Sequence, residues 1–125
     1  MWSTLVAIRD TLATLPDVKT CKIGIETGLS PDDYPIIRLV PSSLDPGTPW
    51  RSMNVLVYYG TPLAEADQGL EALYEALFVW EGRIREALRV GRGYRCKWLE
   101  TVTDEDRLEH YKLFASRFEV TTCAP

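Results

Sequence analysis

The alternation of apolar and polar positions predicts two helices and a set of short strands. Between Gly69 and Val90 the apolar residues recur at helical spacing, three or four positions apart. At about 100° per residue they fall on one narrow stripe, which is formed by Leu70, Leu73, Leu77, Trp80, Ile84 and Leu88. Asp67 precedes this stretch as the expected N-cap, and Gly91 follows it as a stop signal. We therefore predict a long helix that lays one face on a sheet or on another helix.

The rest of the chain predicts a shorter helix and a sheet. Ser3–Leu15 shows helical spacing on one face and ends at Pro16. Alternating or β-rich stretches predict strands at Cys21–Thr27, Ile36–Val40, Ser52–Tyr59, Tyr94–Thr103 and Lys112–Thr122. Pro41–Trp50 is rich in proline and glycine and is expected to be a long loop. With hairpins between successive strands, the order α-β-β-β-α-β-β predicts an α+β fold, a mainly antiparallel sheet of about five strands with both helices packed on one face.

Length and composition indicate a single α+β domain over residues 1–125. A hydrophobic content of 46% with 26% charged residues is enough to build a core. No apolar run approaches the roughly 18 residues of a membrane span, and the N-terminus lacks the basic start of a signal peptide. We therefore expect no membrane partner and synthesis inside the cell. Cys21, Cys96 and Cys123 are odd in number and show no C-x-x-C spacing, so we expect unpaired thiols.

Two apolar residues on the long helix do not belong to the stripe. Phe78 and Val79 are predicted to point to its polar side, together with Gly82. Single exposed apolar residues are common on protein surfaces, so this can be an ordinary surface. The back of the helix can instead meet a partner subunit, where Gly82 would admit another backbone closely. Trp50, at the end of the long loop, is the other candidate for a subunit interface.

The residue types that usually carry catalysis do not come together in this sequence. The single histidine, His110, lies in an acidic stretch, and no metal-binding spacing of histidine or cysteine occurs. Asp104, Glu105, Asp106 and Glu109 could hold a hard cation only weakly, because they lack the D-x-D-x-D-G framework. We therefore expect no enzyme activity, no cofactor and no metal site.

Charge leaves one competing class of function open. The net charge of −4 argues against nucleic acid as the main partner, and we expect no sequence-specific binding to it. The basic residues are nevertheless concentrated between Arg83 and Lys97. On a helix Arg83 points away from Arg85 and Arg89, so these residues do not form one stripe. A small nucleic-acid or anion-binding module that uses Arg83–Lys97 is the alternative interpretation.

The order of the elements also supports a resemblance. A short helix, three strands joined by Pro-rich stretches, a long helix and two closing strands resemble the tail terminator family of tailed bacteriophages. The closing segments Trp98–Glu100 and Arg117–Val120 also support this resemblance, which covers nearly the whole chain. It rests on no invariant motif, and the related tail completion and head-closure proteins (head–tail connectors) share much of the pattern.

This resemblance implies a structural protein of the virion tail, assembled in the host cytoplasm. The family implies a homo-oligomer, a hexameric ring that caps the tail tube, stops its polymerisation and presents the head-joining face. The tail tube protein and a head completion protein would be its partners. Such a ring needs two different patches on each subunit, for which the back of the helix and the Pro41–Trp50 loop are candidates. The acidic loop, Asp104 to Glu109, would face the lumen and repel passing DNA.

Overall fold

The computed structural model describes residues 1–24, 35–45, 47, 49–62, 70–89, 91, 93–103 and 111–123. The elements in these ranges follow the predicted order α-β-β-β-α-β-β. The helices are α1 (Trp2–Ala13) and α2 (Leu70–Arg89). The strands are β1 (Thr20–Ile23), β2 (Ile36–Asp45), β3 (Trp50–Pro62), β4 (Arg95–Val102) and β5 (Tyr111–Cys123).

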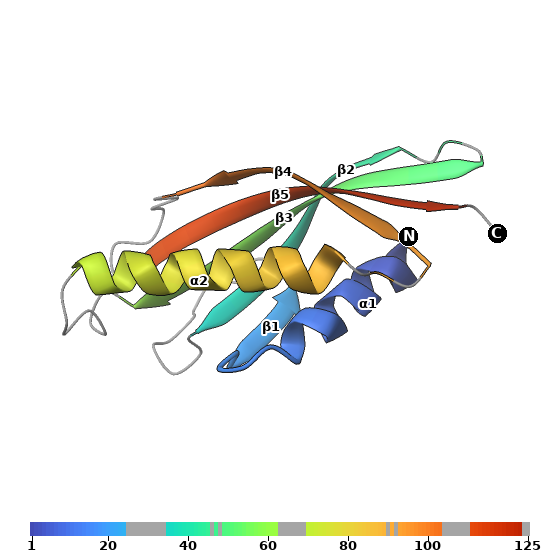
Figure 1. The fold of residues 1–125 in the computed structure, drawn as a ribbon. Helices are drawn as coiled ribbons and strands as arrows, with labels where there is room; N and C mark the ends of the chain where they lie inside the picture. Colours follow the sequence, from blue (N-terminus) through green and yellow to red (C-terminus); the bar gives the residue numbers. More distant parts are fainter. Residues whose placement is uncertain are drawn as a thin grey trace.

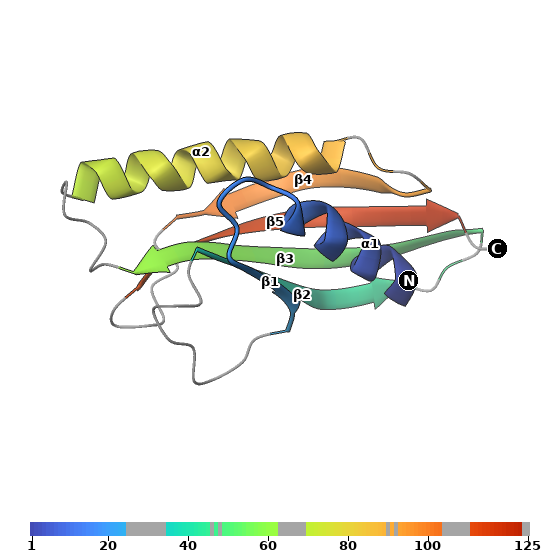
Figure 2. The same cartoon turned by 90° about the horizontal axis from the view of Figure 1, so that it is seen from below.

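The described strands form one mixed sheet in the order β1-β2-β3-β5-β4. The pairs β2–β3, β3–β5 and β5–β4 are antiparallel, and both helices lie on the same face (Figure 1; Figure 2). The predicted α+β class is therefore confirmed. The hairpin expected between the first two strands is wrong, because β1 runs parallel to β2. The connecting residues 24–35 are numerous enough for the crossover that a parallel pair needs.

The core lies between the helices and the inner face of the sheet. α1 covers the β1 side and α2 covers the β4 side. The helices contribute the buried residues Leu5, Ile8, Leu12, Leu73, Leu77, Ile84 and Leu88. The strands contribute, among others, Leu39, Val55, Val57, Tyr59, Phe114 and Phe118. The apolar stripe predicted for the long helix is thus confirmed, with Trp80 half-buried at its border and the side chain of Leu70 outside the description.

The stretch expected to be a long loop is mostly strand. β2 continues to Asp45 and β3 begins at Trp50, so Pro41–Trp50 forms the end of a hairpin. A register shift just after Pro41 accommodates this proline, which has no N–H for the ladder. The Asn54 side-chain amide, on β3, donates to the Ser43 hydroxyl at 3.0 Å. This β2–β3 hairpin extends past both helices in Figure 1.

The turn between α2 and β4 is tight. A Cβ atom at Gly91 would lie 2.5 Å from the Tyr94 ring, so only glycine leaves room there. The Thr122 hydroxyl donates to the Gly93 carbonyl at 2.8 Å and ties the turn to the end of β5. β4 therefore runs back alongside the second half of α2.

Candidate assembly surface

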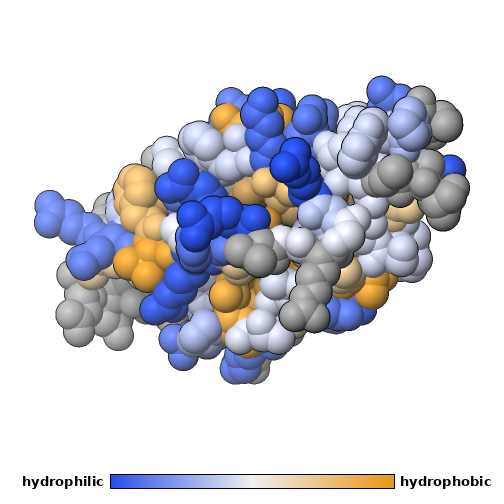
Figure 3. Space-filling model, turned by 45° about the vertical axis from the view of Figure 1, so that its right-hand side comes forward, coloured by the Kyte–Doolittle hydropathy of each residue, from blue (hydrophilic) through white to orange (hydrophobic). Residues whose placement is uncertain are grey.

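Large apolar side chains remain exposed in separate regions of the molecule. They are Leu44 and Trp50 on the β2–β3 hairpin, Phe78 and Val79 on α2, Trp98, Leu99 and Val102 on β4, and Trp2 on α1. Trp50 is 60% exposed and Phe78 is 58% exposed, so most of each side chain is accessible to a partner. Figure 3 shows the apolar areas of one side as separate patches with hydrophilic side chains between them.

Phe78 and Val79 both lie outside the buried stripe of α2, as predicted, and are 58% and 46% exposed, but they occupy different flanks of the helix. The Phe78 ring packs edge-on against the buried ring of Phe114, with the centroids 5.5 Å apart. Val79 lines a shallow hollow on another flank together with Trp80 and Arg83. The reason is geometric, because neighbouring helix residues diverge by about 100°. A subunit contact at Phe78, Val79, Gly82 or Trp50 stays a prediction, and these residues do not form one patch.

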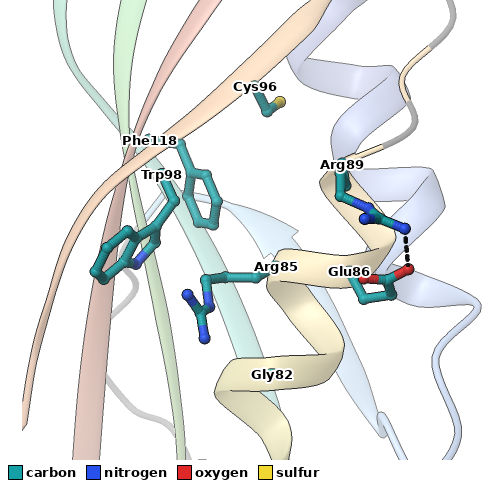
Figure 4. A pocket seen from close by; sticks show the side chains of 7 residues that line it. All are labelled: Gly82, Arg85, Glu86, Arg89, Cys96, Trp98 and Phe118. Atoms are coloured by element: carbon teal, nitrogen blue, oxygen red, sulfur yellow. Dashed lines mark hydrogen bonds and ion pairs between the residues drawn. The ribbon is translucent and has the colours of Figure 1, made fainter.

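A groove of about 320 Å³ runs between α2 and β4. Its helical wall consists of Gly82, Arg85, Glu86 and Arg89, and its strand wall consists of Cys96, Trp98 and Phe118 (Figure 4). Gly82 has no side chain, so the helical wall is recessed at this position. A Cβ atom placed there would meet no atom within 4 Å. The groove thus has aromatic side chains on one side and charged ones on the other.

Hydrogen bonds hold the Trp98 indole in place. Its Nε1–H donates to the Thr101 hydroxyl at 2.9 Å. The Thr101 oxygen lies 2.9 Å from the Ser116 hydroxyl, which lies 3.1 Å from the Tyr59 hydroxyl. Burial raises the pKa of Tyr59 far above its usual range, and the negative charge of Glu81 raises this pKa further. The neutral Tyr59 hydroxyl forms the buried end of this chain of hydroxyl groups.

An ion pair on α2 positions one side chain of the helical wall of the groove. The Arg85 guanidinium lies over the Trp98 ring, 4.9 Å from its centroid. The same guanidinium pairs with Glu81, one turn earlier, whose side chain is only 11% exposed. This pair has the i, i+4 order that favours helices. Glu81 therefore holds Arg85 against the indole, and both walls of the groove are held in position.

The basic residues between Arg83 and Lys97 do not form one surface. Arg85 and Arg89 each pair with a carboxylate on α2. Arg83 lines the hollow on a different flank. Lys97 alternates with the inward-facing Trp98 along β4 and so belongs to the opposite face of the sheet. Arg92 lies outside the described residues. This distribution gives no support to the nucleic-acid or anion-binding alternative.

We expect the described thiols to react slowly. Cys21 and Cys96 are free and partly buried, and burial raises the pKa of Cys21 to about 11 and that of Cys96 to about 12. Because the thiolate is the nucleophile, we expect iodoacetamide to alkylate both slowly at pH 8 in the folded protein and quickly in urea. Mass spectrometry of timed samples measures both rates. Equal rates in the two states would contradict the burial. The side chain of Cys123 lies outside the description.

The acidic candidates lie outside the described residues. Asp104, Glu105, Asp106, Glu109 and His110 fall in residues 104–110. In the part of the chain that the structure describes, no group of three or more His, Cys, Asp or Glu could hold a metal ion. No helix in that part is long and apolar enough to cross a membrane.

Comparison with known proteins assigns no family to this chain. No protein-family pattern matches it, and no curated protein matches it significantly. The argument for a function therefore rests on the surfaces described above.

Proposed function

We propose that this protein is a tail terminator of a tailed bacteriophage. It assembles as a ring, taken as hexameric, on the end of the tail tube, stops the addition of tube subunits and presents the face that joins the head. It acts by surface complementarity rather than by catalysis.

The observation that carries this proposal is the presence of two separate apolar surfaces on one subunit. One is a face of the β2–β3 hairpin end, with Trp50, and the other is the α2–β4 region, with Phe78 and Trp98. A closed ring needs two unlike patches on each subunit, because each interface joins the front of one copy to the back of the next. Rigid aromatic side chains are also the residues that most often dominate such contacts.

The test mixes this protein with the purified tail tube protein of the same phage and measures tube lengths by electron microscopy. We expect short tubes that carry gold-labelled copies of this protein at their ends only. The control is an unrelated protein of similar size and charge, which should leave tube length unchanged.

Two results would contradict the proposal. Tubes of equal length with and without this protein would exclude the terminator function. Binding to the purified head–tail connector without any binding to tubes would favour a tail completion or head-closure role instead.

A further inference from the structure

The end of the β2–β3 hairpin has two unlike faces. Leu44 pairs with Met53, which is buried on the helix side of the sheet, so Leu44 belongs to that side. Trp50 is three residues from Met53 and belongs to the opposite face, together with Asp45, which pairs with Ser52. Residues in such diagonal positions are about 7–8 Å apart, within reach of one partner surface. One face of the hairpin end therefore presents an exposed indole beside a carboxylate.

The Asp45 carboxylate has a fixed position. Its Oδ1 accepts a hydrogen bond from the backbone N–H of Gly47 at 3.1 Å. Trp50 is held by the ladder, since it pairs with Cys123 at the end of β5. The indole and the carboxylate thus lie at neighbouring positions on one face of the sheet, and the Gly47 hydrogen bond restricts the carboxylate, which lowers the entropy lost when it binds.

The α2–β4 groove is complementary to this pair of side chains. Trp98 and Phe118 supply aromatic surface, and the groove volume of about 320 Å³ is enough for one indole. Arg85 and Arg89 stand on its helical wall and are 47% and 72% exposed, whereas the carboxylate partner of Arg85 is buried. Glu86, which pairs with Arg89, is 67% exposed on the same wall, so the accessible rim carries two guanidinium groups and one carboxylate, an excess of one positive charge that suits Asp45.

We infer that the α2–β4 groove receives Trp50 from a second copy of this chain, with Asp45 facing Arg89. This inference rests on the proposed ring and names the two surfaces that join its subunits. Trp50 pairs with Cys123, two residues beyond the Thr121 partner of the first β4 residue, Arg95. The hairpin end thus projects beyond β4, away from the groove of its own chain (Figure 1).

Such a contact joins unlike surfaces and leaves one hairpin and one groove free in every open chain of subunits. Rotation can then close the chain into a ring. One aromatic residue buries about 150–250 Å², well below the area of a stable dimer, so a single contact is weak. We therefore expect association only at high protein concentration or on the tube end.

The experiment uses two variants that are defective on opposite sides of the contact. Trp50→Ala removes the indole, and Gly82→Trp fills the groove from a position where a Cβ atom meets nothing within 4 Å. Each variant alone should associate about 10- to 100-fold more weakly than the wild type, as expected for the loss of one buried aromatic. Mixed in equal amounts, they should form a heterodimer that grows no further, because one intact hairpin and one intact groove remain.

Matched variants control for folding and for general surface changes. Leu44→Ala removes an equally exposed residue from the other face of the hairpin, since Leu44 and Trp50 are both 60% exposed. Arg83→Trp adds an indole on another flank of α2, outside the groove, and so controls for the bulk of Gly82→Trp. Both should assemble like the wild type. Sedimentation velocity at near-millimolar concentration measures association, and circular dichroism checks that every variant is folded.

The outcomes separate this contact from the function of the ring. A mixture of folded Trp50→Ala and Gly82→Trp that stays monomeric, or a Leu44→Ala variant as defective as Trp50→Ala, overturns the contact. If the mixture gives the heterodimer while tubes ignore the wild-type protein, the contact stands and the terminator function fails. If wild-type protein caps tubes and Gly82→Trp caps them equally well, the function stands and the contact fails.

Discussion

Replacing Leu77 by alanine is expected to lower the free energy of unfolding by about 2–5 kcal/mol. Leu77 is 2% exposed and lies at the centre of the stripe that α2 lays on the sheet. The loss combines the transfer free energy of the removed methyl and methylene groups with the cost of the cavity left behind. The loss should fall in the upper half of that range if the strands beneath Leu77 resist collapse into the cavity.

Urea unfolding of the wild type and the variant measures this loss. Val79→Ala is the control, because Val79 is only two residues away on α2 but is 46% exposed. Val79→Ala should change the free energy of unfolding by no more than about 0.5 kcal/mol, as most surface substitutions do. If Leu77→Ala costs less than about 1 kcal/mol, the orientation of α2 on the sheet is wrong.

The sequence was sufficient to predict the helices because periodicity is a local signal. Leu73, Leu77, Ile84 and Leu88 repeat at helical spacing, and all four are buried. The described part of this helix, Leu70–Arg89, lies within the stretch that the sequence predicts, Gly69–Val90. The Glu81–Arg85 ion pair has the i, i+4 spacing that favours a helix.

The hairpin and the first strand pair were less predictable, because local composition misleads there. Pro41 and Gly47 indicate a loop, yet the ladder passes Pro41 by a register shift, and Asn54 bonds Ser43 across the strands. The hydrogen bond between Asn54 and Ser43 joins residues eleven positions apart, so the local sequence pattern does not reveal it. The parallel pairing of β1 with β2 likewise depends on the path of the connection, which periodicity does not encode.

The groove itself was beyond sequence analysis. Gly82 was recognised as a place for close approach, but the aromatic wall opposite it comes from β4 and β5. Nothing in the spacing of Tyr59, Thr101 and Ser116 indicates that their hydroxyl groups meet. The contact of the Phe78 ring with Phe114 does not follow from the sequence either, because a helical wheel does not show how far the sheet reaches around the helix.

Replacing Arg85 by alanine is expected to lower the free energy of unfolding by roughly 1–3 kcal/mol. This change removes the ion-pair partner of the Glu81 carboxylate, which is 11% exposed. Breaking a fully buried pair costs about 3–5 kcal/mol, but Arg85 is 47% exposed, so solvent reduces the effect. Part of the loss also comes from the contact of its guanidinium with the Trp98 ring.

Glu81→Leu separates the ion pair from this packing contact. Leucine removes the buried charge at similar volume, so we expect a change within about 1 kcal/mol or a slight stabilisation. In the Glu81→Leu variant, Arg85→Ala should lower the free energy of unfolding only through the lost packing on Trp98, because no unpaired carboxylate remains. A double-mutant cycle from urea unfolding of the four proteins should therefore give a coupling free energy of at least about 1 kcal/mol. Additive changes would show that Glu81 does not hold Arg85 in place, and that the wall of the groove depends on the Trp98 contact alone.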